Sequence, residues 1–371
     1  MEQDPSRRST PSVVNQIHAK DVAREQFLEH SNLNFFASKS VEHFEDCIVL
    51  NKYSLLLNSD GKLATTALGE HVFWHPQAIN MGLPEEARKN EIDKRLSFLQ
   101  KQADLAIDRA TQLDIPPSPY ETIYCMHPFE WYPYGHIFDS LQRLYSVQSV
   151  AKGTRTVLIN RNGLRVNDLA SHFEMLGYSP NQLLSIPKGC SAIRVKKLVV
   201  PSSPATYTQF THDSIKWLRE SYLENPRFLD FAAEMDGVIK DEFAVYLDRS
   251  GSRRDLLNAT EFKAALRSEI PLKWIYLKGN ECLLWTIYVL SRAKLVVGVH
   301  GAMFVNTIFT DSRSSIVEVC PSNRQVSNMV RMAKPCVNHI LLIHEAEEDF
   351  KINLDINSVI ERTRELMLSA G

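Results

Sequence analysis

The sequence predicts an α/β protein with two halves, each built around a largely parallel sheet. The chain has 371 residues, which is enough for two hydrophobic cores. From residue 122 onward, apolar strand-like runs alternate with helical runs, which is the pattern of a sheet flanked by helices. In the second half these runs are almost continuous Val, Ile and Leu, as expected for strands buried on both faces.

The first half is predicted to span residues 16–204. Residues 1–15 are polar with few apolar side chains, so we expect a disordered tail there. A hairpin with its turn at residues 59–61 follows, then a short strand at 71–74 and a helical region at 84–113. Pro-rich residues 116–120 mark a boundary, and beyond them the strands TIYCM, TRTVLIN and IRVKKLVVP alternate with two helices.

The second half, residues 205–371, shows the same alternation more sharply. After a helical stretch, it contains the predicted strands FAVYLDR, KWIYLKG, KLVVGVH, SSIVEVCP and HILLIH. An amphipathic helix over residues 357–370 ends the chain, and crossing back to the first half is one expectation for it.

Composition excludes some partners. The 42 basic and 44 acidic side chains give a net charge of −2, so no global field favours nucleic acid. The six cysteines are scattered without a CxxC pair, and no signal-like segment or apolar run of about 18 residues occurs. We therefore expect a cytoplasmic protein without a nucleic-acid partner. Peripheral membrane association and the oligomeric state stay open.

The most informative motif follows the strand at residues 295–297. It consists of Gly298, Val299, His300, Gly301 and Ala302 and leads into a predicted helix. Ligands bind at strand ends in open α/β sheets, glycines allow close approach, and helix N–H groups attract anions. On this pattern alone, a diphosphate site and a tight turn with a capping histidine are about equally supported.

Two further features sit on neighbouring predicted strands. Arg249, Arg253 and Arg254 form a basic loop after FAVYLD, which suits either a pyrophosphate clamp or a solvated loop. Glu318 lies inside the apolar strand SSIVEVCP and needs a partner, for which the hydroxyls of a ribose and a salt bridge to Arg313 or Lys294 are equal alternatives.

In the first half, a helix predicted to start near Gly135 would place His136, Asp139 and Arg143 on one face. Together with Trp131 and Tyr134, this face suits a sugar acceptor. The alternative is an amphipathic helix whose polar stripe is solvated and whose aromatic neighbours belong to the core.

Several motifs are missing from the sequence. It has no Asp-x-Asp pair, no GxGxxG, no P-loop and no GxSxG, which removes the main support for metal–diphosphate, dinucleotide, P-loop and serine-hydrolase chemistry. His71 and His75 read as a stray pair and not as metal ligands.

The segments YGHIFDSLQRLY, YLDRSGSRRDLLN, GVHGAMFVNTIF and IVEVCP, in this order, resemble glycosyltransferase family 61 over about residues 120–325. The resemblance implies a GT-B fold, in which two Rossmann-like domains face a central cleft. It also implies an inverting transferase that takes a UDP-sugar as donor and needs neither a cofactor nor a metal ion.

The resemblance assigns roles by position. The donor-binding set is Arg249, Arg254, Asn258, Gly298, His300, Gly301, Ala302, Asn306 and Glu318, to which the basic loop adds Arg253. The first-half signature is Gly135, His136, Asp139 and Arg143. An inverting displacement needs a base, for which we choose Asp139, with His136 as the alternative. Trp131, Tyr134 and Arg143 are assigned to the acceptor.

The sequence departs from the family pattern at Val299, Met303, Asp248 and around Leu284 and Trp285. Asp248 would add negative charge beside the proposed diphosphate site. We expect a glycosyltransferase of surface polysaccharide or glycolipid biosynthesis. The alternatives are an inactive scaffold protein with the same fold, or a sugar-nucleotide-processing enzyme such as an epimerase.

Overall fold

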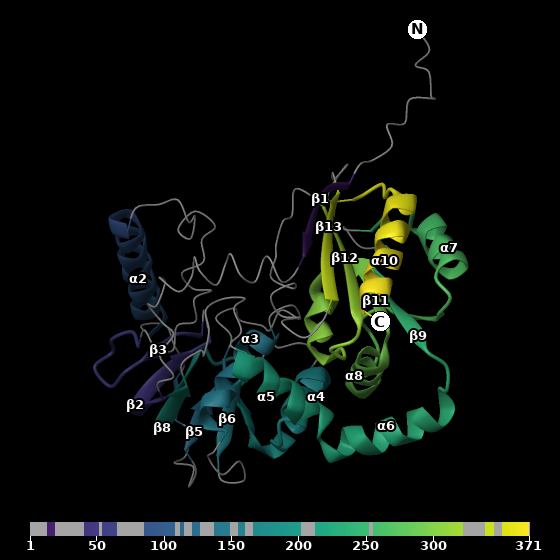
Figure 1. The fold of residues 1–371 in the computed structure, drawn as a ribbon. Helices are drawn as coiled ribbons and strands as arrows, with labels where there is room; N and C mark the ends of the chain where they lie inside the picture. Colours follow the sequence, from purple (N-terminus) through teal and green to yellow (C-terminus); the bar gives the residue numbers. More distant parts are fainter. Residues whose placement is uncertain are drawn as a thin grey trace. The chain divides into compact units, whose positions relative to one another are not determined.

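The computed structural model describes residues 13–18, 41–51, 54–64, 85–107, 112–114, 121–126, 137–148, 155–159, 166–201, 212–251, 255–321, 338–344 and 351–370. The chain forms two compact units: Leu33–Tyr222, and Leu223–Gly371 together with Met1–Asn32. Both units combine a sheet with helices (Figure 1), which confirms the predicted mixed α/β class.

The unit Leu33–Tyr222 is built on a sheet with the strand order β3-β2-β8-β5-β6-β7, in which β4 also pairs with β8. The strands are β2 (Val41–Leu50), β3 (Leu56–Leu57), β4 (Gln112–Asp114), β5 (Thr122–Tyr124), β6 (Thr156–Ile159), β7 (Leu183–Ser185) and β8 (Ala192–Pro201). Strands β4 to β8 are parallel where they pair, whereas β2 runs antiparallel to β3 and β8.

The predicted turn at residues 59–61 is confirmed. The side chain of Asn58 accepts hydrogen bonds from the backbone N–H groups of Asp60 and Lys62, and Gly61 adopts a φ of +74° that favours glycine. The predicted strand at 71–74 and the boundary at 116–120 lie outside the described residues.

The helices of this unit are α2 (Glu85–Ile107), α3 (Ile137–Leu141), the 3₁₀ helix η5 (Gln142–Val147), α4 (Val166–Met175), the short η7 (Pro180–Gln182) and α5 (His212–Leu223). The predicted helical region at 84–113 corresponds to α2 as far as Ile107, whereas its last residues, 112 and 113, belong to β4. Helix α2 packs Leu99 and Ala103 against Leu50, Leu55 and Leu57, so this long helix is held by one apolar stripe.

The second unit has the strand order β1-β13-β12-β11-β9-β10. Its strands are β1 (Val13–His18), β9 (Phe243–Leu247), β10 (Lys273–Leu277), β11 (Leu295–Val299), β12 (Ser315–Pro321) and β13 (Asn338–His344). The five strands from β9 to β13 are parallel, as predicted, and β1 is antiparallel to β13. Strand β1 begins at Val13, which falls inside the tail that the sequence predicts to be disordered.

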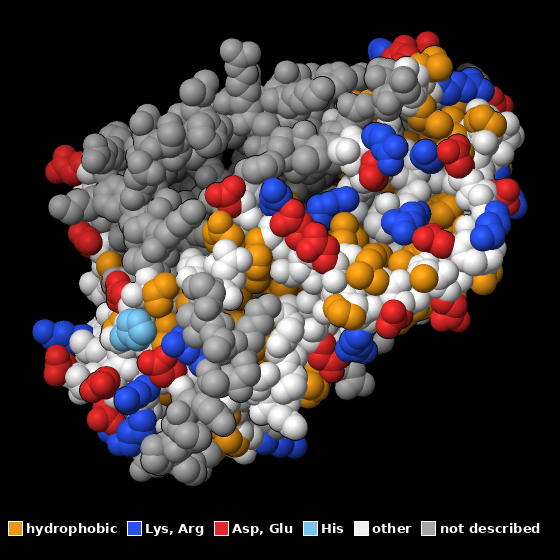
Figure 2. Space-filling view, turned by 60° about the horizontal axis from the view of Figure 1, so that its bottom comes forward, with side chains coloured by type: hydrophobic (Ala, Val, Ile, Leu, Met, Phe, Trp, Pro, Cys, Tyr) orange, Lys and Arg blue, Asp and Glu red, His pale blue; other side chains and the backbone are white. Residues whose placement is uncertain are grey.

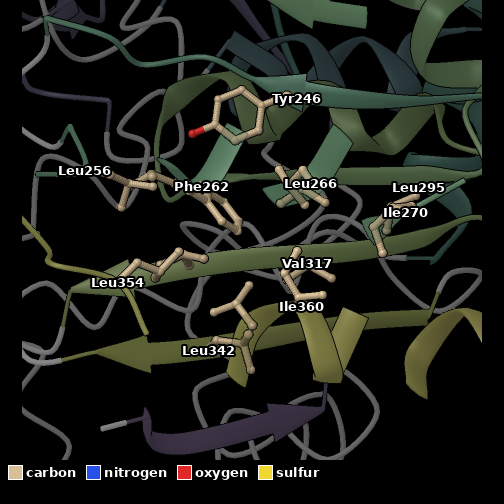
Figure 3. Close-up of a cluster of buried hydrophobic side chains, with 14 of the residues drawn as sticks. Tyr246, Leu256, Phe262, Leu266, Ile270, Leu295, Val317, Leu342, Leu354 and Ile360 are labelled. Carbon is tan, nitrogen blue, oxygen red and sulfur yellow. The ribbon is translucent and has the colours of Figure 1, made fainter. Parts of the chain in front are cut away.

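The helices of the second unit are α6 (Pro226–Val238), α7 (Ala259–Glu269), α8 (Leu283–Arg292), the 3₁₀ helix η8 (Ala302–Phe309) and α10 (Ile356–Ala370). Side chains from alternate strand positions, such as Tyr246 and Val317, form a core with Phe262 of α7 and Ile360 of α10 (Figure 3). Helix α10 thus packs on the sheet of its own unit. Helix α8 contacts β9 and η8, and Phe304 of η8 stacks on His339 of β13.

Acidic and basic side chains are interspersed over the described surface in the view of Figure 2, in keeping with the balanced charge. Among the described residues, the cysteines Cys47, Cys125, Cys190, Cys282 and Cys320 are not joined in disulfide bonds. Among the described helices, none combines the length and apolar character that crossing a membrane requires.

Candidate functional site

The strand order of the second unit changes direction between β9 and β11. The chain runs from β9 through α7 to β10 at the edge, then through α8 back to β11 on the other side of β9. In open α/β sheets, ligands bind outside the carboxyl ends of the strands at such a switch point. The segments located there are residues 248–251 after β9 and 300–302 after β11.

Arg249 connects these two strand ends. Its Nη1 donates a hydrogen bond of 3.1 Å to the backbone oxygen of His300, and the backbone N–H of His300 donates in turn to Val319 of β12 at 2.7 Å. Partial burial lowers the pKa of Arg249, with nearby Asp255 acting in the opposite direction. A guanidinium stays charged under such conditions, so a cation is fixed at the switch point.

Two of the predicted glycines make room for neighbouring protein groups. A Cβ atom on Gly301 would lie 1.3 Å from Nη1 of Arg249, and a Cβ on Gly298 would lie 2.8 Å from Cβ of Leu247. Gly301 has an extended backbone with φ of 175°, so space alone, and not its dihedral angles, calls for glycine. The glycines thereby allow Arg249 and the β9 strand to lie against β11.

Glu318 contacts two histidines. Its Oε1 lies 2.5 Å from Nδ1 of His300, and its Oε2 lies 3.0 Å from Nε2 of His339, on β13. All three side chains are buried, with exposed fractions of 0% for Glu318, 3% for His300 and 2% for His339. The predicted alternative of a salt bridge to Arg313 or Lys294 is wrong, because these cations pair with Asp311 and Glu242 instead.

Burial opposes the ionisation of Glu318, but the hydrogen bonds from His300 and His339 outweigh it and lower the pKa of Glu318 to about 2. Glu318 is therefore a carboxylate at neutral pH. Both of its oxygens already have imidazole partners, so its contact with the site runs through His300.

Asp248 does not place an uncompensated charge beside Arg249. Its carboxylate accepts two hydrogen bonds of 2.9 Å from Nζ of Lys263 on α7, and one each from the hydroxyl and the backbone N–H of Ser250. Although burial raises the pKa of Asp248, these hydrogen bonds lower it overall. The negative charge of Asp248, which would otherwise repel a diphosphate, is thus compensated by the ammonium group of Lys263.

Asn258 has a structural contact. Its Nδ2 donates to the backbone oxygen of Leu354 at 2.8 Å, and its Oδ1 accepts from the N–H of Leu354 at 2.9 Å. Because both ends of the amide are engaged by the backbone, we leave Asn258 out of the proposed donor site. Ala302 and the buried Asn306 lie on η8, which follows Gly301.

The remaining predicted residues are only partly described. Arg253, Arg254, Trp131, Tyr134, Gly135, His136, His71 and His75 lie outside the described residues. Asp139 lies on α3, but its side chain is also outside the described part of the structure.

The predicted helical face is wrong for Arg143. Helix α3 spans Ile137–Leu141 and the chain continues as the 3₁₀ helix η5 from Gln142, so the spacing of a continuous α-helix does not extend to Arg143. Arg143 is 3% exposed and its guanidinium lies 5.8 Å from the ring centre of Tyr124, at the end of β5. The alternative of a solvated polar stripe is therefore also wrong for Arg143.

Sequence reasoning missed His339 and Phe304. The ring of Phe304 stacks on that of His339, with 6.5 Å between centroids and an interplanar angle of 16°. The signal that would have found His339 is the need of a buried Glu318 for partners on the adjacent strand.

Within the described part of the chain, no cluster of three or more His, Cys, Asp or Glu side chains could hold a metal ion. The family model described as Glycosyltransferase 61 matches residues 134–317. This span includes α3, Arg249 and the 300–302 segment, and it ends one residue before Glu318. The chain matches no curated protein sequence.

We predict that Gly301→Ala lowers the free energy of unfolding by about 1–3 kcal/mol, because the added methyl group displaces Arg249. In an Arg249→Ala background the same change should cost little, since the space is then vacant. Gly237→Ala on α6 is the control: nothing lies within 4 Å of its Cβ position, so stability should stay equal or rise. Urea unfolding measures all four variants, and equal costs of Gly301→Ala in both backgrounds would contradict the packing argument.

A second prediction concerns acid stability. Since the folded-state pKa of Glu318 lies below its ordinary value of 4.5, its ionisation stabilises the fold above that pH, and this contribution is lost as the pH falls towards 2. Over that window the wild-type protein should lose about 3 kcal/mol more unfolding free energy than Glu318→Gln. Glu365→Gln, which changes an exposed carboxylate on α10, is the control and should follow the wild type. Parallel curves for wild type and Glu318→Gln in urea unfolding at graded pH would refute the prediction.

Proposed function

Because this chain belongs to glycosyltransferase family 61 and is thus a glycosyltransferase, we propose that it transfers a sugar from a UDP-sugar to a hydroxyl group of a glycan or glycolipid. In this proposal the transfer inverts the anomeric carbon, needs no metal ion, and serves surface polysaccharide or glycolipid biosynthesis. The two units are proposed to be the Rossmann-like domains of a GT-B fold, with the donor on the second unit and the acceptor on the first.

The observation that supports this proposal best is the position of Arg249. A fixed guanidinium at the switch point of a parallel sheet matches the need of a diphosphate for a cation at strand ends. Nucleoside diphosphates are the leaving groups of sugar-nucleotide donors, so a cation at this place stabilises the charge that develops during transfer.

The proposal that transfer needs no metal ion also rests on the guanidinium group of Arg249. In metal-dependent transfer a divalent cation neutralises the leaving diphosphate. Here Arg249, with Arg253 and Arg254 following in the same loop, offers positive charge from the protein itself. His300, directly after β11, is proposed to donate a hydrogen bond to the diphosphate.

The acceptor half is proposed to supply the base. Asp139 lies on α3, where the side chains of Ile137, Phe138 and Leu141 are fully buried. The ring of Phe138 makes edge contacts with His172 and Tyr222, which hydrogen-bond to each other at 2.8 Å. The helix that carries Asp139 is therefore anchored, which a positioned base requires.

The donor assignment predicts that UDP binds to the wild-type protein in the presence of EDTA and that Arg249→Ala weakens this binding by about tenfold or more, since a charge-assisted hydrogen bond to phosphate is lost. Arg254→Ala should weaken it as well. The matched control is Arg364→Ala, because Arg364 is an exposed arginine of the same unit that pairs with Glu269. Calorimetric titration decides: absent binding to the wild type, or equal affinity in Arg249→Ala, rules out this donor site.

The base assignment predicts that Asp139→Asn keeps the affinity for UDP but loses about 10²-fold or more in kcat. Asp213→Asn, on α5 of the same unit, is the control with an exposed carboxylate. If His136 is the base instead, His136→Ala shows the large loss and Asp139→Asn a milder one. Initial rates with a UDP-sugar and the acceptor measure this, and normal turnover in both variants would exclude both residues.

A further inference from the structure

Met303 exposes part of an apolar side chain close to the switch point. It is the second residue of η8, and residues 304–309 of this helix are buried, whereas Ala302 and Met303 are only half-buried. The exposed apolar surface of η8 is therefore confined to its first turn. This turn follows directly on the place where Arg249 contacts the backbone of His300.

The side chain of Met303 reaches the loop that follows β10. A Cβ atom on Gly279 would lie 3.1 Å from Sδ and 3.4 Å from Cγ of Met303, so the thioether packs directly on the backbone of this glycine. Strand β9 lies between β10 and β11 in the sheet, and Met303 therefore passes the carboxyl end of β9 to make the contact. We call the side chain of Met303 and the backbone of Gly279 the methionine wall.

The loop side of the methionine wall is held in place by hydrogen bonds. Oε1 of Glu281 accepts from the backbone N–H of Lys278 at 2.7 Å, and Oε2 of Glu281 accepts from that of Gly279 at 2.8 Å. The backbone N–H of Asp248 donates to the backbone oxygen of Leu277 at 2.7 Å, which ties the end of β10 to the loop that carries the switch-point arginine. The wall is thus a fixed surface at the strand ends.

The chemistry of the strand ends changes from one side of β9 to the other. Arg249 supplies a guanidinium between β9 and β11, where it lies against Gly301, and Met303 supplies a thioether only two residues further along. Gly301 and Gly279 follow strands that are two positions apart in the sheet, or about 10 Å at the usual strand spacing. A nucleoside diphosphate has the same sequence of properties, because its charged phosphates and its flat ring are separated by one ribose.

The methionine wall suits a ring better than a sugar. The hydroxyl groups of a sugar need hydrogen-bond partners, whereas the sulfur of Met303 is a weak acceptor and the N–H of Gly279 already donates to Glu281. The face of a planar base needs no such partners, and the polarizable sulfur of methionine makes favourable contacts with rings.

We propose that the methionine wall is the subsite for the base of the donor nucleotide: with the diphosphate at Arg249, the face of the ring lies against the thioether of Met303. This inference rests on the donor site proposed above and adds the direction in which the nucleotide lies, from β11 towards β10. The sugar to be transferred then lies on the side of the diphosphate that faces away from β10.

The first test locates the base in the complex of the wild-type protein. The protein is labelled with ¹³C in its methionine methyl groups, the signal of Met303 is assigned with Met303→Leu, and UDP is added to saturation. The methyl group of Met303 should show nuclear Overhauser contacts to H5 or H6 of the uracil ring. Bound UDP without a contact between this methyl group and the ring overturns the proposal.

The second test compares ligands with and without a base by calorimetric titration. Met303→Ala should bind UDP about tenfold more weakly, because apolar contact area is lost, and should bind inorganic pyrophosphate as the wild type does. Met303→Leu keeps the volume and should lose about threefold at most. Unchanged affinity for UDP in Met303→Ala, or an equal loss for UDP and pyrophosphate, contradicts the assignment.

A third test moves Met303 without replacing it. Gly279→Ala places a methyl group against the thioether, and Gly189→Ala is the matched control, because Gly189 has a similar φ of +90° but nothing within 4 Å of its Cβ position. Both changes strain the backbone, but Gly279→Ala alone should weaken UDP binding. In a Met303→Ala background it should have no further effect, since the space is then vacant. Equal effects in both backgrounds overturn the proposal.

Failure of the subsite and failure of the donor site give different results. A wild-type protein that binds neither UDP nor pyrophosphate rules out the donor site, and the subsite with it. A wild-type protein that binds both, with an affinity for UDP that does not depend on Met303, rules out the subsite alone.

Discussion

Glu318 is a charged carboxylate with no exposure to solvent, and neighbouring groups of the second unit stabilise its charge. A buried carboxylate is tolerated only where donors meet both oxygens, which His300 and His339 do from the two neighbouring strands. Phe304 of η8 stacks on His339, and Gly298, directly opposite Glu318 in the sheet, leaves room for Leu247 of β9. The partners of one buried carboxylate therefore also take part in the packing of η8 on the sheet.

The loop after β9 separates two adjacent opposite charges. Asp248 turns towards Lys263 of α7, whose ammonium group also lies 5.3 Å from the ring centre of Tyr246. Arg249 turns the other way, across the strand end to the backbone of His300. This arrangement leaves the positive member of the pair at the switch point and neutralises the negative one away from it. The charge of Asp248 is thus compensated by Lys263, and Asp255 is the acidic group that still acts on Arg249.

Local patterns predicted the second unit well, because strands such as β11 and β12 are continuous apolar runs bounded by glycine, charge or proline. Pairings between distant segments were harder to predict. The order of strands decides that Glu318 meets His339 and not Arg313, and periodicity contains no information on that order. Strand β1 was not predicted for the same reason, since it is defined by its pairing with the distant strand β13. In the first unit, the position of Arg143 was predicted from the spacing of one regular α-helix. That spacing does not apply, because α3 ends at Leu141 and continues as a 3₁₀ helix.

The pair formed by Asn258 and Leu354 links two parts of the chain that are almost a hundred positions apart. A parallel bridge between Leu256 and Ile352, and a hydrogen bond from Leu257 to the backbone oxygen of Ile352, extend the same seam. The segment that follows the arginine loop is therefore clamped by the stretch that leads into the last helix. Removing the stretch around Leu354 would consequently take away the contacts that hold the segment following the Arg249 loop.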